Sequence, residues 1–391
     1  METNPALGVM IFALGGLAGA VFYLPFKKVR NWAWESYWMI YAIAGLIVVP
    51  WVLALSTSPN VVAVLRQSPG TVLASCFGYG ALWGLGGFTW GLMIRYLGVG
   101  LGLAIGCGLC SATGTLIPPI IHGDPQKLYD STSAVVSLIG VVVSLLGIIL
   151  VGMAGMSKES ELPEEEKKKA VAEYNFRKGI IIAIFSGLAS SGMSFGLQGG
   201  QITEYKARFG SQTQLVKSED SVVPPADLVG AAGIFYDKDA KTWVAPRAPE
   251  GESTTSQTWR GMPILVVVLA GGFAVNFLYC LYLNLKNKTL GDYAKKDTPL
   301  VGNLFFAGLA GAIWCCQFIC FKTGEPAMGP RAYIGWAVLM ASAILFSTLL
   351  GILLGEWRGT SKRTRTCLAA GLALLIVSSV IAGISGYLKT A

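Results

Sequence analysis

The chain has 391 residues, of which 53% are hydrophobic and only 13% are charged. A soluble domain carries about a quarter charged residues, so this composition excludes an ordinary soluble protein. The formal net charge of +8 does not require a nucleic-acid partner, because basic loops on one side of a membrane produce the same excess.

Apolar runs of about 20 residues, the length that crosses a hydrocarbon core, recur along the whole chain. No small-residue cleavage site follows the first run, so we expect the first membrane span there rather than a removed signal peptide. The pattern predicts an all-α polytopic membrane protein. The ten expected spans are 7–25, 36–55, 71–94, 98–121, 134–153, 178–199, 261–285, 299–321, 332–354 and 367–388.

Two of the connections between these spans are long. Residues 156–177 contain the charged run 164–169 and are expected to form a solvated linker. Residues 200–260, called the insertion below, are polar and mildly acidic. Within the insertion, 233–245 places two β-rich runs around a polar turn, which predicts a β-hairpin.

Weak internal repeats divide the chain into two halves. Gly16-Leu17-Ala18 recurs as Gly187-Leu188-Ala189, and Trp83 of the third span corresponds to Trp314 of the eighth. The two offsets differ by the length of the insertion. We therefore expect two five-helix repeats, and an odd number of spans inverts the second copy, as in many transporters. The expected units are repeat 1–155, linker 156–177 and repeat 178–391, the last containing the insertion.

The distribution of lysine and arginine predicts the orientation in the membrane. The connections after odd-numbered spans hold 18 of these residues, whereas the remaining short connections and the two tails hold 5. Since basic loops stay in the cytoplasm, we expect both termini and the insertion to be extracytoplasmic.

The stretch 22–38 combines three basic residues with tryptophans and tyrosines around Glu35. Such a mixture is typical of an anchor at the membrane–water interface. It could instead be a functional hinge, with Glu35 as the group that binds a coupled proton. Surrounding rings would favour neutral Glu35 and the basic residues would favour the charged form, so both readings stay open. Glu325 and Glu356 are the next candidates.

Polar and aromatic side chains share helical faces in several spans. An aromatic ring can stack on the C–H face of a sugar, and an amide can both donate to and accept from hydroxyl groups. The same residues could serve only helix packing or interhelical hydrogen bonds. The candidate substrate-binding residues are Tyr79, Trp83, Trp90, Gln198, Asn276, Trp314, Gln317 and Phe318.

Charged residues are expected only at span ends, where Glu35, His122, Asp124, Glu325 and Glu356 lie. Because charge inside a membrane is costly and usually functional, this pattern argues against a charged substrate or a buried proton relay. The sequence contains no catalytic triad, P-loop or zinc motif. We therefore expect no enzyme activity, no metal and no cofactor other than a proton as coupling ion.

The residues FYLPFKKVRNWAWESYW (22–38) closely resemble the signature of the L-rhamnose–proton symporter family of the drug/metabolite transporter superfamily. Supporting matches are WGLGGFTWGLMIRYLG (83–98), GTLIPPII (114–121), GMSF (192–195), the set of Trp314, Gln317 and Phe318, and Gly355-Glu356-Trp357. The resemblance implies ten helices in two inverted repeats. It also implies proton-coupled import of a neutral deoxy-sugar through a bacterial inner membrane.

Two departures from the family pattern concern the insertion, which is expected to be foreign to the family, and Gly87 and Thr89, where some relatives carry asparagines.

Two other functions remain open at this point. One is export of another small metabolite, and the other is a membrane sensor or interaction protein. The sequence leaves the oligomeric state open.

Overall fold

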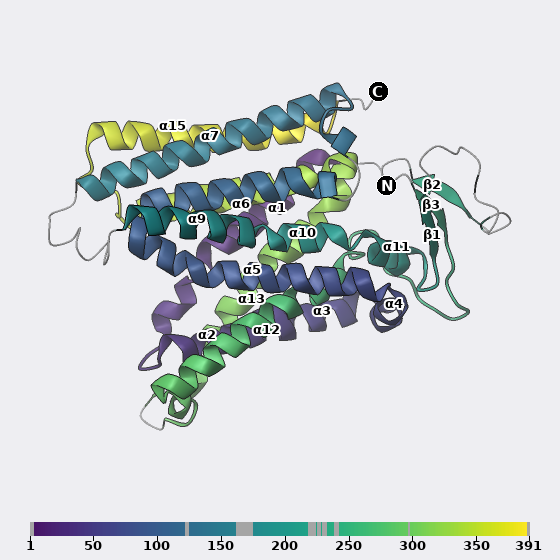
Figure 1. Ribbon diagram of the computed structural model, residues 1–391, viewed down its shortest axis with the longest axis horizontal. Helices are drawn as coiled ribbons and strands as arrows, with labels where there is room; N and C mark the ends of the chain where they lie inside the picture. Colours follow the sequence, from purple (N-terminus) through teal and green to yellow (C-terminus); the bar gives the residue numbers. More distant parts are fainter. Residues whose placement is uncertain are drawn as a thin grey trace.

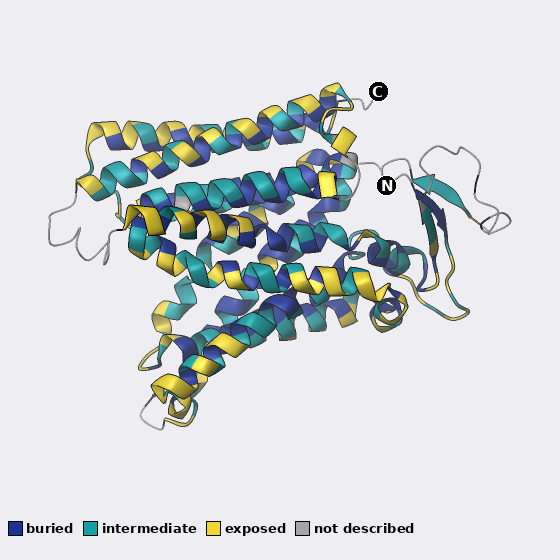
Figure 2. Cartoon of the chain, viewed as in Figure 1, coloured by how far each residue is buried: buried dark blue, intermediate teal, exposed yellow. Residues whose placement is uncertain are grey.

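The computed structural model describes residues 4–121, 125–161, 175–217, 224, 228, 233–237, 242–295 and 298–388. Within these residues, ten helical stretches are long and apolar enough to cross a membrane, which confirms the predicted class (Figure 1). Large apolar side chains, among them Met10, Val52 and Leu278, are exposed on the outer faces of the bundle (Figure 2). In a membrane these faces contact lipid.

Three of the first five spans, the first, the third and the fifth, begin at a polar cap or a proline. The Asn4 side chain accepts a hydrogen bond from Leu7 N at the start of the first helix, and Ser131 caps the fifth in the same way. The spans are α1 (Pro5–Val21) with η1 (Leu24–Lys28), then α2 (Trp34–Ala42), η2 (Ile43–Val48) and α3 (Val49–Thr57), then α5 (Gly70–Leu97), α6 (Val99–Ile121) and α7 (Thr132–Ser160). Short helices α4 (Val61–Gln67) and η3 (Pro125–Leu128) lie between them.

The second five spans follow the same plan. They are α9 (Phe176–Ser190) with α10 (Gly192–Gly199), then α12 (Met262–Asn287), α13 (Leu300–Met328), α14 (Gly335–Leu353) and α15 (Lys362–Ser385). Helix α11 (Gln201–Phe209) prolongs the sixth span into the insertion. The turns η4 (Leu290–Ala294) and η5 (Gly329–Ile334) precede α13 and α14.

The two halves pack against each other through a regular set of helix pairs. Helix α1 contacts α13 and α14, while α9 contacts α5 and α6. Helix α7 lies beside α15 along one edge of the bundle (Figure 1), and α2 contacts α12. Close approach of α5 and α12 depends on Gly80, because a Cβ there would lie 1.9 Å from the carbonyl oxygen of Val268.

The insertion carries a small antiparallel sheet of order β1-β3-β2, formed by β1 (Gln214–Lys217), β2 (Phe235–Asp237) and β3 (Thr242–Ala245). Strands β2 and β3 pair within 233–245. The insertion is fastened to α4, since the Asn60 side chain donates to Ala207 O at 3.0 Å and accepts from Thr255 Oγ1 at 2.7 Å.

Both chain ends lie at the same end of the bundle as the insertion, and we call this the terminal end (Figure 1). Tyr387 Oη donates to Asn4 Oδ1 at 3.3 Å, which places the two ends side by side. The turns η1 and η4 lie at the opposite end.

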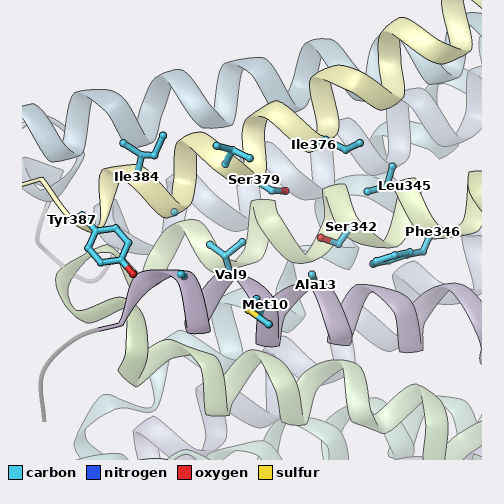
Figure 3. A pocket seen from close by; sticks show the side chains of 13 residues that line it. Val9, Met10, Ala13, Ser342, Leu345, Phe346, Ile376, Ser379, Ile384 and Tyr387 are labelled. Atoms are coloured by element: carbon cyan, nitrogen blue, oxygen red, sulfur yellow. The ribbon is translucent and has the colours of Figure 1, made fainter.

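A groove of about 430 Å³ runs between α1, α14 and α15 (Figure 3). Its lining is almost wholly apolar and includes Met10, Phe346 and the exposed Tyr387. Because it opens on the outer flank of the bundle, it suits lipid chains rather than a hydroxylated solute.

Candidate functional site

Trp83 of α5 and Trp314 of α13 stack on each other near the centre of the bundle. Their ring centroids are 5.0 Å apart with an interplanar angle of 30°. Phe318, one turn after Trp314, meets it edge-on at 4.5 Å and lies 6.2 Å from Trp83. The structure therefore brings three of the predicted substrate residues together where the two halves of the chain meet.

Aromatic residues from the first two spans extend this cluster. Phe22 and Tyr41 meet Trp314 edge-on, at 6.3 and 5.9 Å, and Trp38 packs on Tyr41 at 4.6 Å. Tyr41 is only 3% exposed. Part of the stretch that resembles an interfacial anchor therefore points into the protein instead.

Two of the predicted amides border the aromatic cluster. Asn276 Oδ1 accepts from Trp38 Nε1 at 3.0 Å, and its amide nitrogen donates to Gly272 O at 2.8 Å. The indole of Trp83 lies against Gly272, where an added Cβ would come within 2.4 Å of the ring. Gln317 is buried, and its side-chain oxygen lies against Gly19 of α1.

The other three predicted substrate residues make their contacts elsewhere. Trp90 Nε1 donates to Ser190 Oγ at 2.8 Å, and Gln198 Nε2 donates to Ser194 Oγ at 2.7 Å. Tyr79 packs edge-on against Phe195, with ring centroids 5.6 Å apart. The Trp90 and Tyr79 contacts join α5 to α9 and α10, as interhelical hydrogen bonds and packing would require, whereas Gln198 and Ser194 both belong to α10.

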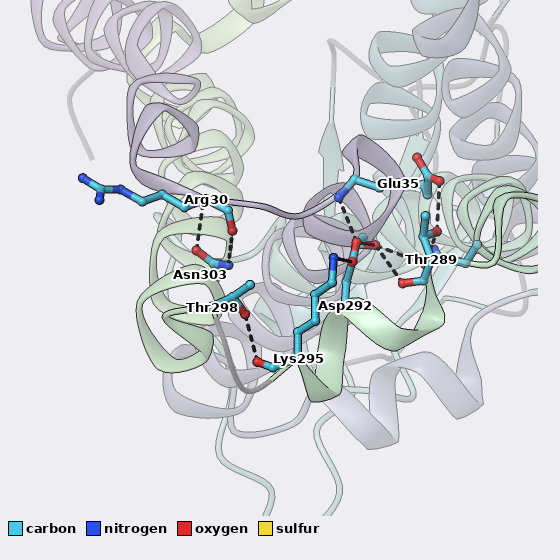
Figure 4. Close-up of polar contacts among 10 residues, drawn as sticks. Arg30, Glu35, Thr289, Asp292, Lys295, Thr298 and Asn303 are labelled. Carbon is cyan, nitrogen blue, oxygen red and sulfur yellow. Dashed lines mark hydrogen bonds and ion pairs between the residues drawn. The ribbon is translucent and has the colours of Figure 1, made fainter.

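Glu35 lies in the first turn of α2 at the opposite end and is 6% exposed. Its Oε1 accepts from Asn287 Nδ2, at the end of α12, at 2.9 Å and from Thr289 Oγ1, in the connection that follows, at 3.0 Å. The neighbouring Asp292 Oδ2 accepts from Ala33 N and Ser36 Oγ, each at 2.8 Å (Figure 4). These hydrogen bonds tie the start of α2 to the α12–α13 connection, and we call this set the loop network.

Glu356 is exposed, in the turn after α14, and its backbone N–H donates to Gly351 O at 2.9 Å. The two other ionisable residues expected at span ends, His122 and Asp124, lie outside the described residues.

The expectation that no charge lies inside a span is wrong. Helix α13 does not end near residue 321 but continues to Met328, so Lys322 and Glu325 are buried inside it. Lys322 Nζ lies 2.5 Å from Glu204 Oε1 and also pairs with Glu325, and Arg260 Nε lies 3.2 Å from Glu204 Oε2. We call these four residues the ionic cluster.

A second buried charge lies at the terminal end. Arg331 of η5 is 2% exposed and pairs with Asp130 Oδ1 at 2.8 Å. Lys322 and Arg331 were counted among basic loop residues, and both prove to be buried partners of carboxylates.

A sequence model described as L-rhamnose-proton symport protein (RhaT) matches residues 1–224 and 229–387. The chain belongs to this family. Relatives named L-rhamnose-proton symporter include those of Cronobacter sakazakii and Escherichia coli, each 28% identical over 98% of this chain and 99% of its own length. The protein of that name from Klebsiella pneumoniae is 27% identical over 97% of both chains.

The family match corrects the view of the insertion as foreign. It covers all of 200–260 except residues 225–228, and the relatives align over almost their full length. The insertion is therefore part of the symport family's common chain.

Sequence reasoning named Glu325 as a candidate but missed Phe22, Tyr41, Asp292 and the other three members of the ionic cluster. The spacing of Trp34, Trp38 and Tyr41 by three and four residues was an available signal for one helical face. Lys322 and Glu325 are three residues apart on α13, but no local signal connected them to Glu204 and Arg260, which lie far away in the sequence.

Proposed function

We propose that this symport-family chain is a secondary active transporter that carries L-rhamnose together with a proton into the cell across the bacterial inner membrane. The match over nearly the whole chain carries the proposal, since full-length relatives are named for this activity. Neither the exporter nor the sensor reading has comparable support.

The alternating access of such a transporter would come from two inverted repeats. Under an exchange of spans 1 to 5 with spans 6 to 10, the contacts of α1 with α13 and α14 correspond to those of α9 with α5 and α6. The pairs α7–α15 and α2–α12 correspond to themselves. This correspondence supports the proposed repeats 1–155 and 178–391, and a substrate site on the shared axis.

We place the sugar between the Trp83 and Trp314 indoles. They belong to corresponding spans, and Phe318 contacts both rings. Asn276 is hydrogen-bonded to Gly272 beside Trp83, and Gln317 lies one turn after Trp314 on α13. The sugar would separate the stacked rings and replace their contact with ring–C–H contacts, while the amides serve its hydroxyl groups. The absence of a charge among these residues suits a neutral substrate.

The activity is tested with the purified protein in proteoliposomes. Labelled L-rhamnose should accumulate when the pH gradient is imposed and should only equilibrate when a protonophore removes it. Other neutral sugars in the same assay define the selectivity. Accumulation that is the same with and without the pH gradient would overturn proton symport. If none of the neutral sugars is transported, the proposed substrate class is wrong.

The site is tested with Trp314→Ala and Gln317→Ala. Loss of a stacking ring or of hydroxyl partners should weaken sugar binding by about 1–3 kcal/mol, which corresponds to roughly 5- to 150-fold in Kd. Trp357→Ala is the control. Trp357 lies under Lys158 at the end of the bundle opposite the terminal end, so its substitution should leave the Kd unchanged. Unchanged affinity in both site variants would move the site elsewhere.

A further inference from the structure

We propose that Glu325 binds the coupled proton and that Lys322, held by Glu204, is the partner it leaves when it does so. This inference rests on the proposed function, because it names the group that couples the proton to the sugar. The sequence favoured Glu35 for this role, and the contacts of the three candidate carboxylates now separate them.

The partners of Lys322 use its full donor capacity. An ammonium group has three N–H donors. Here Nζ contacts Leu197 O at 3.1 Å, Glu204 Oε1 at 2.5 Å and Glu325 Oε2. Two carboxylates thus share one ammonium, so one of them can be neutralised without leaving the buried lysine unpaired.

Glu325 is the carboxylate that can accept a proton at the smaller cost. Glu204 lies between two cations, since Arg260 pairs with its second oxygen at 3.2 Å, whereas the structure gives Glu325 only Lys322 as an ion-pair partner among its described contacts. The other titratable groups beside the cluster are Cys76 of α5 and Tyr205 of α11, and the Tyr205 hydroxyl donates to Asp237 of the insertion.

The two other candidates lack this arrangement. The described partners of Glu35 are a neutral amide and a neutral hydroxyl in the loop network, so its carboxylate has no cation to exchange for a proton. Glu356 is exposed in the turn after α14. A group in continuous contact with water on one side is poorly placed to carry a proton to the other.

Helix α13 connects the proton site to the sugar site. Lys322 follows Phe318 by one turn, and Glu325 lies about 10 Å beyond Phe318 along the helix, at 1.5 Å per residue. Lys322 Nζ also donates a hydrogen bond to the carbonyl oxygen of Leu197, near the junction of α10 and α11. A change in the Lys322–Glu325 pair therefore acts on the helix that carries Trp314 and Phe318.

The proposed step is one proton transfer. A proton from water at the terminal end adds to the Glu325 carboxylate, and the ion pair with Lys322 opens while Lys322 remains bound to Glu204. The neutral acid can be enclosed in the apolar interior, away from water, at a far lower cost than the carboxylate. When the site opens to the other side, Glu325 returns the proton to water and binds Lys322 again.

The test compares two transport modes in proteoliposomes. Glu325→Gln keeps the shape of the neutral acid, so it should exchange labelled for unlabelled sugar across the bilayer but fail to accumulate sugar when a pH gradient is imposed. A helix-packing role would reduce both modes together. Glu250→Gln is the matched control, because Glu250 is exposed in the insertion at the same end, and it should accumulate sugar like the wild type.

The outcomes separate the two proposals. A wild type that does not respond to the pH gradient would overturn the proposed function. A responsive wild type with a Glu325→Gln variant that still accumulates sugar would overturn only the role of Glu325.

If Glu325→Gln loses both modes, Glu325→Asp decides. Its shorter carboxylate pairs less closely with Lys322, so the proton competes with a weaker ion pair. The pH dependence of accumulation should move to higher pH in this variant. An unchanged pH profile would overturn the proposal.

Discussion

Two lysine–carboxylate pairs with the same three-residue spacing lie at opposite ends of the bundle. Lys322 and Glu325 belong to α13, and the Lys322 side chain is 2% exposed. Asp292 and Lys295 belong to η4 and the residue after it, and the Lys295 side chain is 47% exposed with an Nζ–Oδ1 distance of 3.4 Å. Spacing alone therefore does not determine what such a pair contributes.

The surroundings of the two pairs explain the difference. Protein groups occupy all three donors of Lys322, so removing it leaves the buried Glu325 without its cation and Glu204 with Arg260 alone. Lys295 is open to water, which replaces its contribution easily. Asp292 instead accepts hydrogen bonds from Ala33 N and Ser36 Oγ. It therefore fastens the start of α2 to the loop between α12 and α13.

The largest expected effect is on stability, in a comparison of Lys322→Met with Lys295→Met. Lys322→Met should lower the free energy of unfolding by about 3–5 kcal/mol, because two buried carboxylates lose their shared cation. Lys295→Met should cost about 0–1 kcal/mol, as exposed ion pairs do. Denaturant unfolding in detergent measures both values.

Equal losses in the two variants would contradict the comparison. A double variant, Lys322→Met with Glu325→Gln, should recover part of the loss, since one of the uncompensated charges is gone. No recovery would mean that Glu325 does not interact with Lys322.

A smaller effect is expected from Asp292→Asn in the loop network. Loss of the charged acceptor for Ala33 N and Ser36 Oγ should cost about 1–2 kcal/mol at neutral pH. Burial raises the pKa of Asp292, but hydrogen bonds from Ala33, Ser36 and Lys295 outweigh it and hold the pKa below its usual value.

The lowered pKa determines how this cost varies with pH. The stabilisation is fully present above the unfolded-chain pKa of about 3.9, and it is lost as the pH falls through the lower native value. The difference in unfolding free energy between wild type and Asp292→Asn should therefore be constant from about pH 7 to 5 and shrink below about pH 4. A difference that grows on acidification would contradict the assigned contacts.

The smallest perturbation tests which side of the membrane each end occupies. A cysteine at Ser253, exposed in the insertion, should react with an impermeant thiol reagent in intact cells, and a cysteine at Ser160, exposed at the end of α7, should not. The parent chain with its eight native cysteines provides the background. The reverse labelling would place the ionic cluster at the cytoplasmic side.

Much of the fold could be predicted because membrane spans follow from local composition. A run of about 20 apolar residues identifies a span wherever its neighbours lie. The Trp83–Trp314 contact was also accessible, since two tryptophans in corresponding spans pointed to a shared position. The end of α13 was not, because Lys322 interrupts the apolar run, and one of the two carboxylates that compensate its charge, Glu204, lies far away in the sequence.

Only part of the candidate site could be predicted from the sequence. Residue type and helical face identified Trp314, Gln317 and Phe318, which lie on one helix. The rings near Glu35 in the sequence left open whether it was an interfacial residue or a functional carboxylate, and the structure shows it buried. Its hydrogen-bond donors, Asn287 and Thr289, come from the end of α12 and the connection after it, and no local pattern predicted them.

The attachment of the insertion has a practical consequence for imaging. A small membrane protein offers little outside the detergent micelle by which single particles can be aligned. Here the sheet of β1, β2 and β3 projects from the bundle (Figure 1), while Asn60, the residue before α4, is hydrogen-bonded to Ala207 and Thr255 of the insertion. An antibody fragment raised against this sheet would report the orientation of the helices beneath it, and would serve as an alignment mark for electron cryo-microscopy.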